Sequence, residues 1–117
     1  MDKNDESNRR AIELAAKAAG ITILGWETNL YGYVACIADS EMSPTGYWQP
    51  WMDDGDAFRL AVKLNMQIES PTRGSCRVKI AGVYRGEGAY LDEEFRSRKF
   101  GTRWAIVRAA ADVGLHQ

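Results

Sequence analysis

The stretch WQPWMDDGDAFRLAVKL, residues 48–64, decides how the middle of the chain folds. Three aspartates come directly before an amphipathic helical pattern. Asp53 or Asp54 can cap a helix by accepting a hydrogen bond from a backbone N–H one turn further on. Asp56 would lie in the first turn, where the exposed amides and the helix dipole favour negative charge. The stretch therefore predicts a helix start, and its tryptophans raise the question of a binding site.

The helix predicted after these aspartates runs from about residue 55 to 64. Phe58, Ala61, Val62 and Leu64 follow helical spacing and are expected to form its buried face. The basic residues between them are expected to face solvent.

Length and composition predict one folded domain. The chain has 117 residues, of which 45% are hydrophobic and 26% are charged, as in ordinary globular domains. We expect a single domain over residues 1–117, with residues 1–6 disordered. No apolar run is long enough to span a bilayer, and the polar N-terminus lacks the apolar region of a signal peptide. We therefore expect a cytosolic protein that does not bind membranes.

Periodicity predicts the element order α-β-β-α-β-β-(β)-α. Such an order favours an α+β fold, an antiparallel sheet of four or five strands with three helices packed on it. The first and last helices share an alanine-rich face and a closing glycine, and both are expected to dock on the sheet through small residues. Residues 39–50 are predicted to be a loop and 84–88 a turn. The predicted helices cover residues 7–20, 55–64 and 102–113, and the predicted strands cover 21–26, 33–38, 66–70, 75–83 and, more weakly, 89–95.

The aromatic residues before the second helix form a candidate protein-binding surface. Trp48 can pack onto the helix that follows, whereas Trp51 is expected to be exposed, and exposed tryptophans are common anchors in interfaces. Helix capping alone would explain the acidic residues. The ligand spacing and the distal glutamate of a calcium loop are missing, so no metal site is predicted. The candidate residues are Tyr47, Trp48, Trp51, Asp53, Asp54 and Asp56.

A basic group near the last helix is a candidate anion-binding site. Backbone amides at a helix start favour anions, although four basic residues around a loop can also be merely solvated. In contrast, residues 39–56 contain no basic residue, and patches of opposite charge could meet in a homo-oligomer. The candidate residues are Arg96, Arg98, Lys99 and Arg103.

Catalytic patterns are missing from the sequence. The only histidine is His116, beside the C-terminus, so a histidine-activated nucleophile is not available in the body of the chain. There is no phosphate-binding loop and no dinucleotide fingerprint. We expect no enzyme activity and no cofactor.

Three segments resemble a family of short proteins encoded by temperate phages and prophages of Gram-negative bacteria. They are IELAAKAAGI (12–21), the W-x-P-x-x-D-D-G-D-A-x-R-L-A-V-K-L pattern (48–64) and the R-x-A-I-V-R-A-A-A-x-x-G pattern (103–114). The chain departs from the family pattern at Trp51 and Trp104, where a small aliphatic and a basic residue are usual. The resemblance implies a phage context and a small α/β/α sandwich, and it implies no activity.

These observations predict a phage or prophage accessory protein that acts by binding. The leading hypothesis is a protein-binding module that acts on a host or phage protein, such as an inhibitor of host defence. Replacing Trp51 and Asp54 would then abolish binding without lowering the melting temperature. The alternative is a small-ligand protein that binds a nucleotide or another anion. The third hypothesis, nucleic-acid binding, is disfavoured by a net charge of −1.

Overall fold

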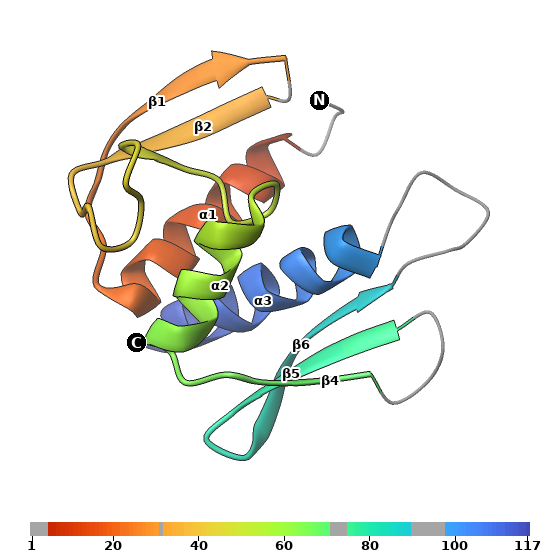
Figure 1. Ribbon diagram of the computed structural model, residues 1–117. Coiled ribbons are helices and arrows are strands. Elements are labelled where there is room, and N and C mark those ends of the chain that lie inside the picture. The colour runs from red at the N-terminus through yellow and green to blue at the C-terminus, as the bar shows by residue number, and fades with distance from the viewer. Residues whose placement is uncertain (1–4, 31, 71–74, 90–97) are drawn as a thin grey trace.

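Two antiparallel sheets enclose a layer of helices (Figure 1). The computed structural model describes residues 5–30, 32–70, 75–89 and 98–117. Sheet A has the strand order β1-β2-β3 and sheet B the order β4-β5-β6. In the described ranges the elements are α1 (Asp5–Ala19), β1 (Ile23–Asn29), β2 (Gly32–Ile37), β3 (Tyr47–Trp48), α2 (Asp54–Lys63), β4 (Gln67–Glu69), β5 (Ser75–Ile80), β6 (Val83–Ala89) and α3 (Arg98–Leu115).

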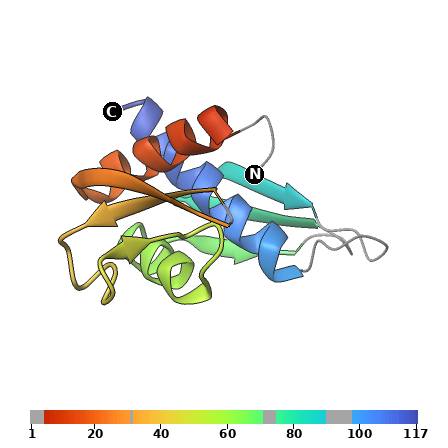
Figure 2. The same cartoon turned by 90° about the horizontal axis from the view of Figure 1, so that it is seen from above.

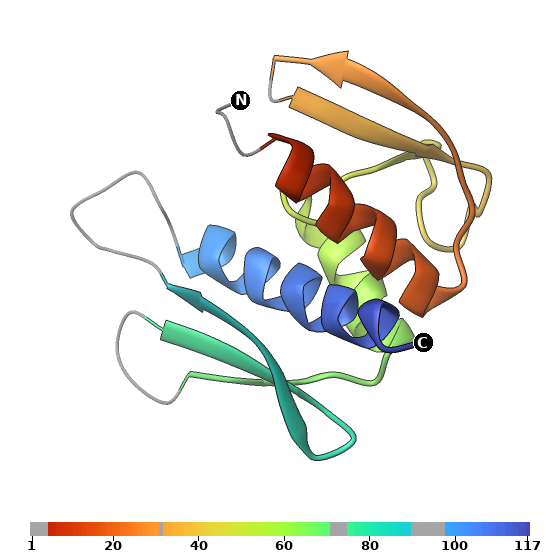
Figure 3. The ribbon, with the colours of Figure 1, turned by 180° about the vertical axis from the view of Figure 1, so that it is seen from behind.

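The α+β class is confirmed, but the single sheet is wrong. The helices lie between the two sheets, as the view from behind also shows (Figure 3), whereas an α/β/α sandwich has its sheet between helices. Viewed from above, α1 and α2 lie on either side of α3 (Figure 2). Helix α1 begins at Asp5, inside the stretch expected to be disordered. Over the described ranges, no helix combines the length and the hydropathy that a membrane crossing requires.

Two strands form where the sequence predicted loop and turn. Strand β3 pairs with β2 within the predicted loop, through Ala35 with Trp48 and Cys36 with Tyr47. Strand β6 occupies the predicted turn at 84–88, and the actual turn lies at Ala81 and Gly82, which both have positive φ. Two adjacent residues of positive φ are typical of the tight turns that join antiparallel strands. The weak strand predicted over 89–95 lies almost wholly outside the described residues.

The glycines of β6 belong to the strand because helix α3 lies directly on them. Gly86 pairs with Val78 and Gly88 pairs with Cys76. Paired residues lie on the same face of a sheet, and α3 covers this face at both glycines. A Cβ atom at Gly88 would overlap the carbonyl oxygen of Gly101 in α3. The absence of side chains at these positions is therefore what allows the helix and the sheet to approach closely.

Helix α3 also makes a close contact with α1. It extends to Leu115, and the glycine expected to end it, Gly114, lies inside it. A Cβ atom at Gly114 would overlap the carbonyl oxygen of Leu14 in α1. The small faces of the two similar helices thus pack against each other, and only α3 docks directly on sheet B.

Helix α2 buries a face that differs from the predicted one at Phe58 and Val62, which are exposed, whereas Ala61 is buried as predicted. Its buried residues are Asp56, Ala57, Leu60 and Ala61, while the side chain of Phe58 is exposed. Helical spacing alone predicts that the face with the large residues Phe58 and Val62 turns toward the core. The hydrogen bonds of its first turn, described below, orient it instead.

Adding a side chain at Gly86 should destabilise the protein, because α3 leaves no room for it. In Gly86→Ala the new methyl group would overlap the carbonyl oxygen of Ala105 and lie 2.6 Å from the nitrogen of Ala109. We expect a loss of about 1–3 kcal/mol in the free energy of unfolding, as for other overpacked cores, measured by urea denaturation. Gly25→Ala is the matched control, because this strand glycine has open space around it. Equal stability of the two variants would contradict the close contact.

Candidate functional site

The tryptophans of the predicted binding surface are part of the core. Trp48 is fully buried and the side chain of Trp51 is only 5% exposed. Both belong to the central cluster that also contains residues of α1, α2 and α3. The expectation that Trp51 is exposed is therefore wrong. Of the three predicted aromatic anchors, only Tyr47 reaches the surface.

The acidic residues after the tryptophans organise the start of α2. Asp53 is the N-cap, and its carboxylate accepts a 2.8 Å hydrogen bond from the backbone N–H of Asp56. The carboxylate of Asp54, although exposed, accepts a 2.6 Å hydrogen bond from Arg103 of α3. The capping interpretation is thus confirmed, and Asp54 in addition joins α2 to α3.

Asp56 is a buried anchor between α2 and the segment before it. Its carboxylate accepts hydrogen bonds from the backbone N–H of Gln49 at 2.9 Å and from the guanidinium of Arg59 at 2.6 Å. Arg59 also donates to the carbonyl oxygen of Met42. Burial raises the pKa of Asp56, and the hydrogen bonds from Gln49 and Arg59 oppose that rise. This network holds the predicted loop against the helix.

The predicted anion-binding residues are not shown to converge on an open site. Arg103 donates from Nε to the carbonyl oxygen of Trp51 at 3.0 Å and pairs with Asp54, so its guanidinium already holds the α2 start in place. Arg98 and Lys99 begin helix α3, but their side chains lie outside the described part, as does the whole of Arg96.

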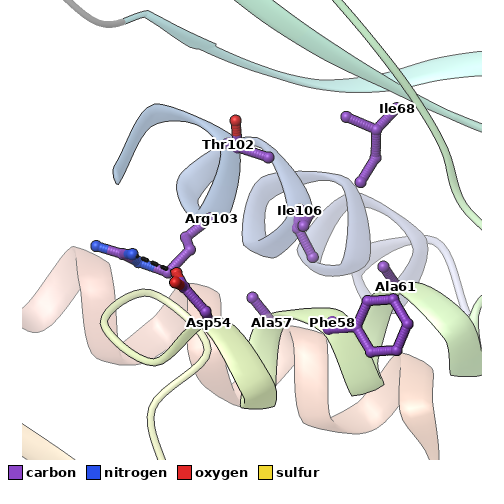
Figure 4. A pocket seen from close by; sticks show the side chains of 8 residues that line it. All are labelled: Asp54, Ala57, Phe58, Ala61, Ile68, Thr102, Arg103 and Ile106. Atoms are coloured by element: carbon purple, nitrogen blue, oxygen red, sulfur yellow. Dashed lines mark hydrogen bonds and ion pairs between the residues drawn. The ribbon is translucent and has the colours of Figure 1, made fainter. Parts of the chain in front are cut away.

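Among the described residues, an apolar hollow lies between α2, α3 and β4. We call it the α2–β4 groove; it has a volume of about 270 Å³ and mostly apolar walls (Figure 4). Three large apolar side chains line it or lie beside it: Phe58 is 68% exposed, Val62 62% and Ile68 43%. Its lining residues are Asp54, Ala57, Phe58, Ala61, Ile68, Thr102, Arg103 and Ile106.

The groove was missed in the sequence because its most exposed residues were assigned to the core. Phe58 and Val62 are four residues apart, so they lie on the same face of α2. That pattern is the same whether the face packs inside the protein or against a partner. The signal that could have separated the two cases is Asp56, whose carboxylate turns inward and accepts hydrogen bonds from Gln49 and Arg59. Phe58, two positions further along the helix, then lies on the outward side.

Within the residues that the structure describes, no three His, Cys, Asp or Glu side chains are grouped to hold a metal ion. Comparison of the chain with known protein families, characterised proteins and solved structures finds no match. The function is therefore argued from the surface of the molecule.

Trp51→Ala should lower stability, contrary to the expectation from sequence. Removing a buried tryptophan typically costs about 3–5 kcal/mol, and Trp51 lies in the central cluster. Phe58→Ala is the matched control, since an exposed aromatic residue should cost under about 1 kcal/mol. Both values can be read from urea denaturation monitored by far-UV circular dichroism. A Trp51→Ala protein as stable as the Phe58→Ala protein would contradict the burial of Trp51.

The stability contributed by Asp56 should depend on pH. Its raised pKa means that the folded protein binds this proton more tightly than the unfolded chain does. The resulting stabilisation is complete below the ordinary value of 3.8 and is lost as the pH rises through the folded pKa. Asn cannot ionise, so the wild type should exceed Asp56→Asn in stability by more at about pH 3.5 than at about pH 6.5. A difference that grows with pH in denaturation experiments would contradict the direction of the shift.

Proposed function

We propose that this protein acts by binding another protein through the α2–β4 groove. The observation that carries the proposal is the exposure of Phe58 and Val62 on one face of α2, beside a hollow with apolar walls. Burial of such side chains by a partner removes apolar surface from water, which is the main favourable term in association. Neither side chain belongs to the core cluster, so the fold does not account for them.

The lining of the groove favours a protein partner over an anionic small ligand. The groove has a volume of about 270 Å³ and mostly apolar walls, which suit an apolar side chain. Its polar groups Asp54 and Arg103 are paired with each other at 2.6 Å. A single apolar anchor side chain suits this space better than a nucleotide does.

The partner segment we propose is an amphipathic helix with acidic flanks. Phe58 and Val62 form the kind of ridge that packs against a second helix, and helix-in-groove binding is a common recognition mode. The second half of the chain is basic in sequence: residues 57–117 contain eleven basic and six acidic residues. Lys63 is exposed one residue beyond Val62. Acidic residues beside the apolar face would complement this charge.

The resemblance to temperate-phage proteins suggests where such a partner would be found. On this proposal the chain is a phage or prophage accessory protein in the bacterial cytoplasm, and its partner is a host or phage protein whose surface it occupies. Inhibition of a host defence factor would need no catalysis. The predicted aromatic–acidic residues then act indirectly, because they hold α2 and hence the groove in position.

Photo-crosslinking would test the groove. A photoreactive amino acid at Val62 should form an adduct with a different protein, whereas one at Val83, an exposed valine of sheet B, should not. Introducing Phe58→Asp should reduce that adduct at least tenfold and change the free energy of unfolding by less than about 1 kcal/mol. A synthetic peptide spanning the crosslinked segment should bind the wild type and not Phe58→Asp in fluorescence anisotropy.

Two outcomes of that experiment would contradict the proposal. An adduct with twice the mass of the chain would show that a second copy covers the groove. Equal crosslinking from positions 62 and 83, unchanged by Phe58→Asp, would show that the groove is not a specific surface.

A further inference from the structure

The outer face of sheet A carries a second hollow, on the side away from the helices. Across β1 and β2, Glu27 pairs with Val34, and across β2 and β3, Cys36 pairs with Tyr47. Alternation along the strands places these four residues on the outer face, because Ala35 and Trp48 face the core. We call this feature the sheet-A hollow; it has a volume of about 250 Å³ and is lined by Glu27, Thr28, Val34, Tyr47 and Gln49.

The sheet-A hollow combines an apolar floor with a carboxylate. Val34 is only 4% exposed although it is not part of the central cluster. Glu27 accepts a hydrogen bond from the thiol of Cys36 at 3.3 Å. A hydrogen bond to Glu27 raises the pKa of Tyr47, and burial together with Glu27 raises the pKa of Cys36. Both donors therefore remain neutral at physiological pH and leave the charge of Glu27 uncompensated.

The segment that contains the hollow is acidic in sequence. Residues 21–56, which build sheet A and the start of α2, contain six acidic residues and no basic residue. Three of the six, at the start of α2, are held by Arg59, Arg103 or the helix cap. In the described part of the chain no lysine or arginine is paired with Glu27. A ligand that supplies the missing positive charge would be favoured at this position.

We propose that the sheet-A hollow binds a primary alkylammonium group, such as the side chain of a lysine. The methylene groups would cover Val34 and the ring of Tyr47, and the ammonium group would reach the carboxylate of Glu27. An ammonium ion beside an aromatic ring and a carboxylate gains from both the ring quadrupole and the charge. The hollow lies on sheet A and the α2–β4 groove lies on the side of sheet B, so this proposal does not depend on the proposed function.

An NMR titration tests the site with defined probes. With n-butylammonium chloride or Nα-acetyl-lysine N-methylamide, the amide signals of Thr28, Val34 and Gln49 should shift and saturate in the millimolar range. Glu27→Gln should weaken the binding at least fivefold. Glu87→Gln, which removes the same charge from an exposed position on sheet B, should leave it unchanged. Tyr47→Phe should retain binding and Tyr47→Ala should weaken it, because the ring and not the hydroxyl contacts the ligand.

The choice of probe also distinguishes the source of the ligand. Tighter binding of the lysine derivative than of spermidine would point to a lysine on a protein partner, and the reverse would point to a free polyamine. Absence of saturable shifts at these amides with every amine would overturn the proposal. So would equal affinities of the wild type and Glu27→Gln, provided that both have the same circular dichroism spectrum.

Discussion

The fold depends on backbone-to-backbone contact along one helix. Helix α3 touches β6 where Gly86 and Gly88 lack side chains, and it touches α1 through Gly114. At such distances van der Waals contacts are made by the main chains themselves, and no side chain can adjust to relieve an added atom. These contacts fix sheet B, α3 and α1 relative to one another. The rest of the molecule is assembled around this unit.

Sheet A and the helices are held together by polar contacts as well as apolar ones. Sheet A is connected to the helices by the segment around Trp48 and Trp51, and the position of that segment is held by Asp56, Arg59 and Arg103. Buried hydrogen bonds of this kind are directional, so they select one arrangement among several that would bury similar apolar surface. Small residues thus set distances on one side of the molecule, and charged hydrogen bonds set orientation on the other.

The sequence could predict local features more reliably than the contacts between elements. The cap at Asp53 and the approximate bounds of α2 follow from short-range chemistry, and they are confirmed. The division into two sheets depends on contacts between residues that are far apart in the sequence. Gly86 and Gly88 are typical of a turn when read alone, and only the position of α3 explains them as strand residues.

The candidate site was harder to predict for the same reason. The spacing of apolar residues on an amphipathic helix predicts an apolar face. It does not show whether that face packs in the core of the protein or lies on its surface. Phe58 therefore could be assigned to the core and Trp51 to the surface, when the structure has them reversed. The two surfaces now proposed, the α2–β4 groove and the sheet-A hollow, both depend on which side of an element faces outward, and that orientation is set by distant residues.

The net charge of −1 conceals an uneven distribution, because residues 21–56 contain six acidic and no basic residues whereas residues 57–117 contain eleven basic and six acidic ones. A charged partner approaching in solution therefore experiences a torque that turns the protein before any contact forms. Segment 21–56 favours cations, and the second half of the chain favours anions. At an ionic strength of about 0.15 M this alignment acts only within about 8 Å of the surface, so it would influence how often an encounter is productive more than how long a complex lasts.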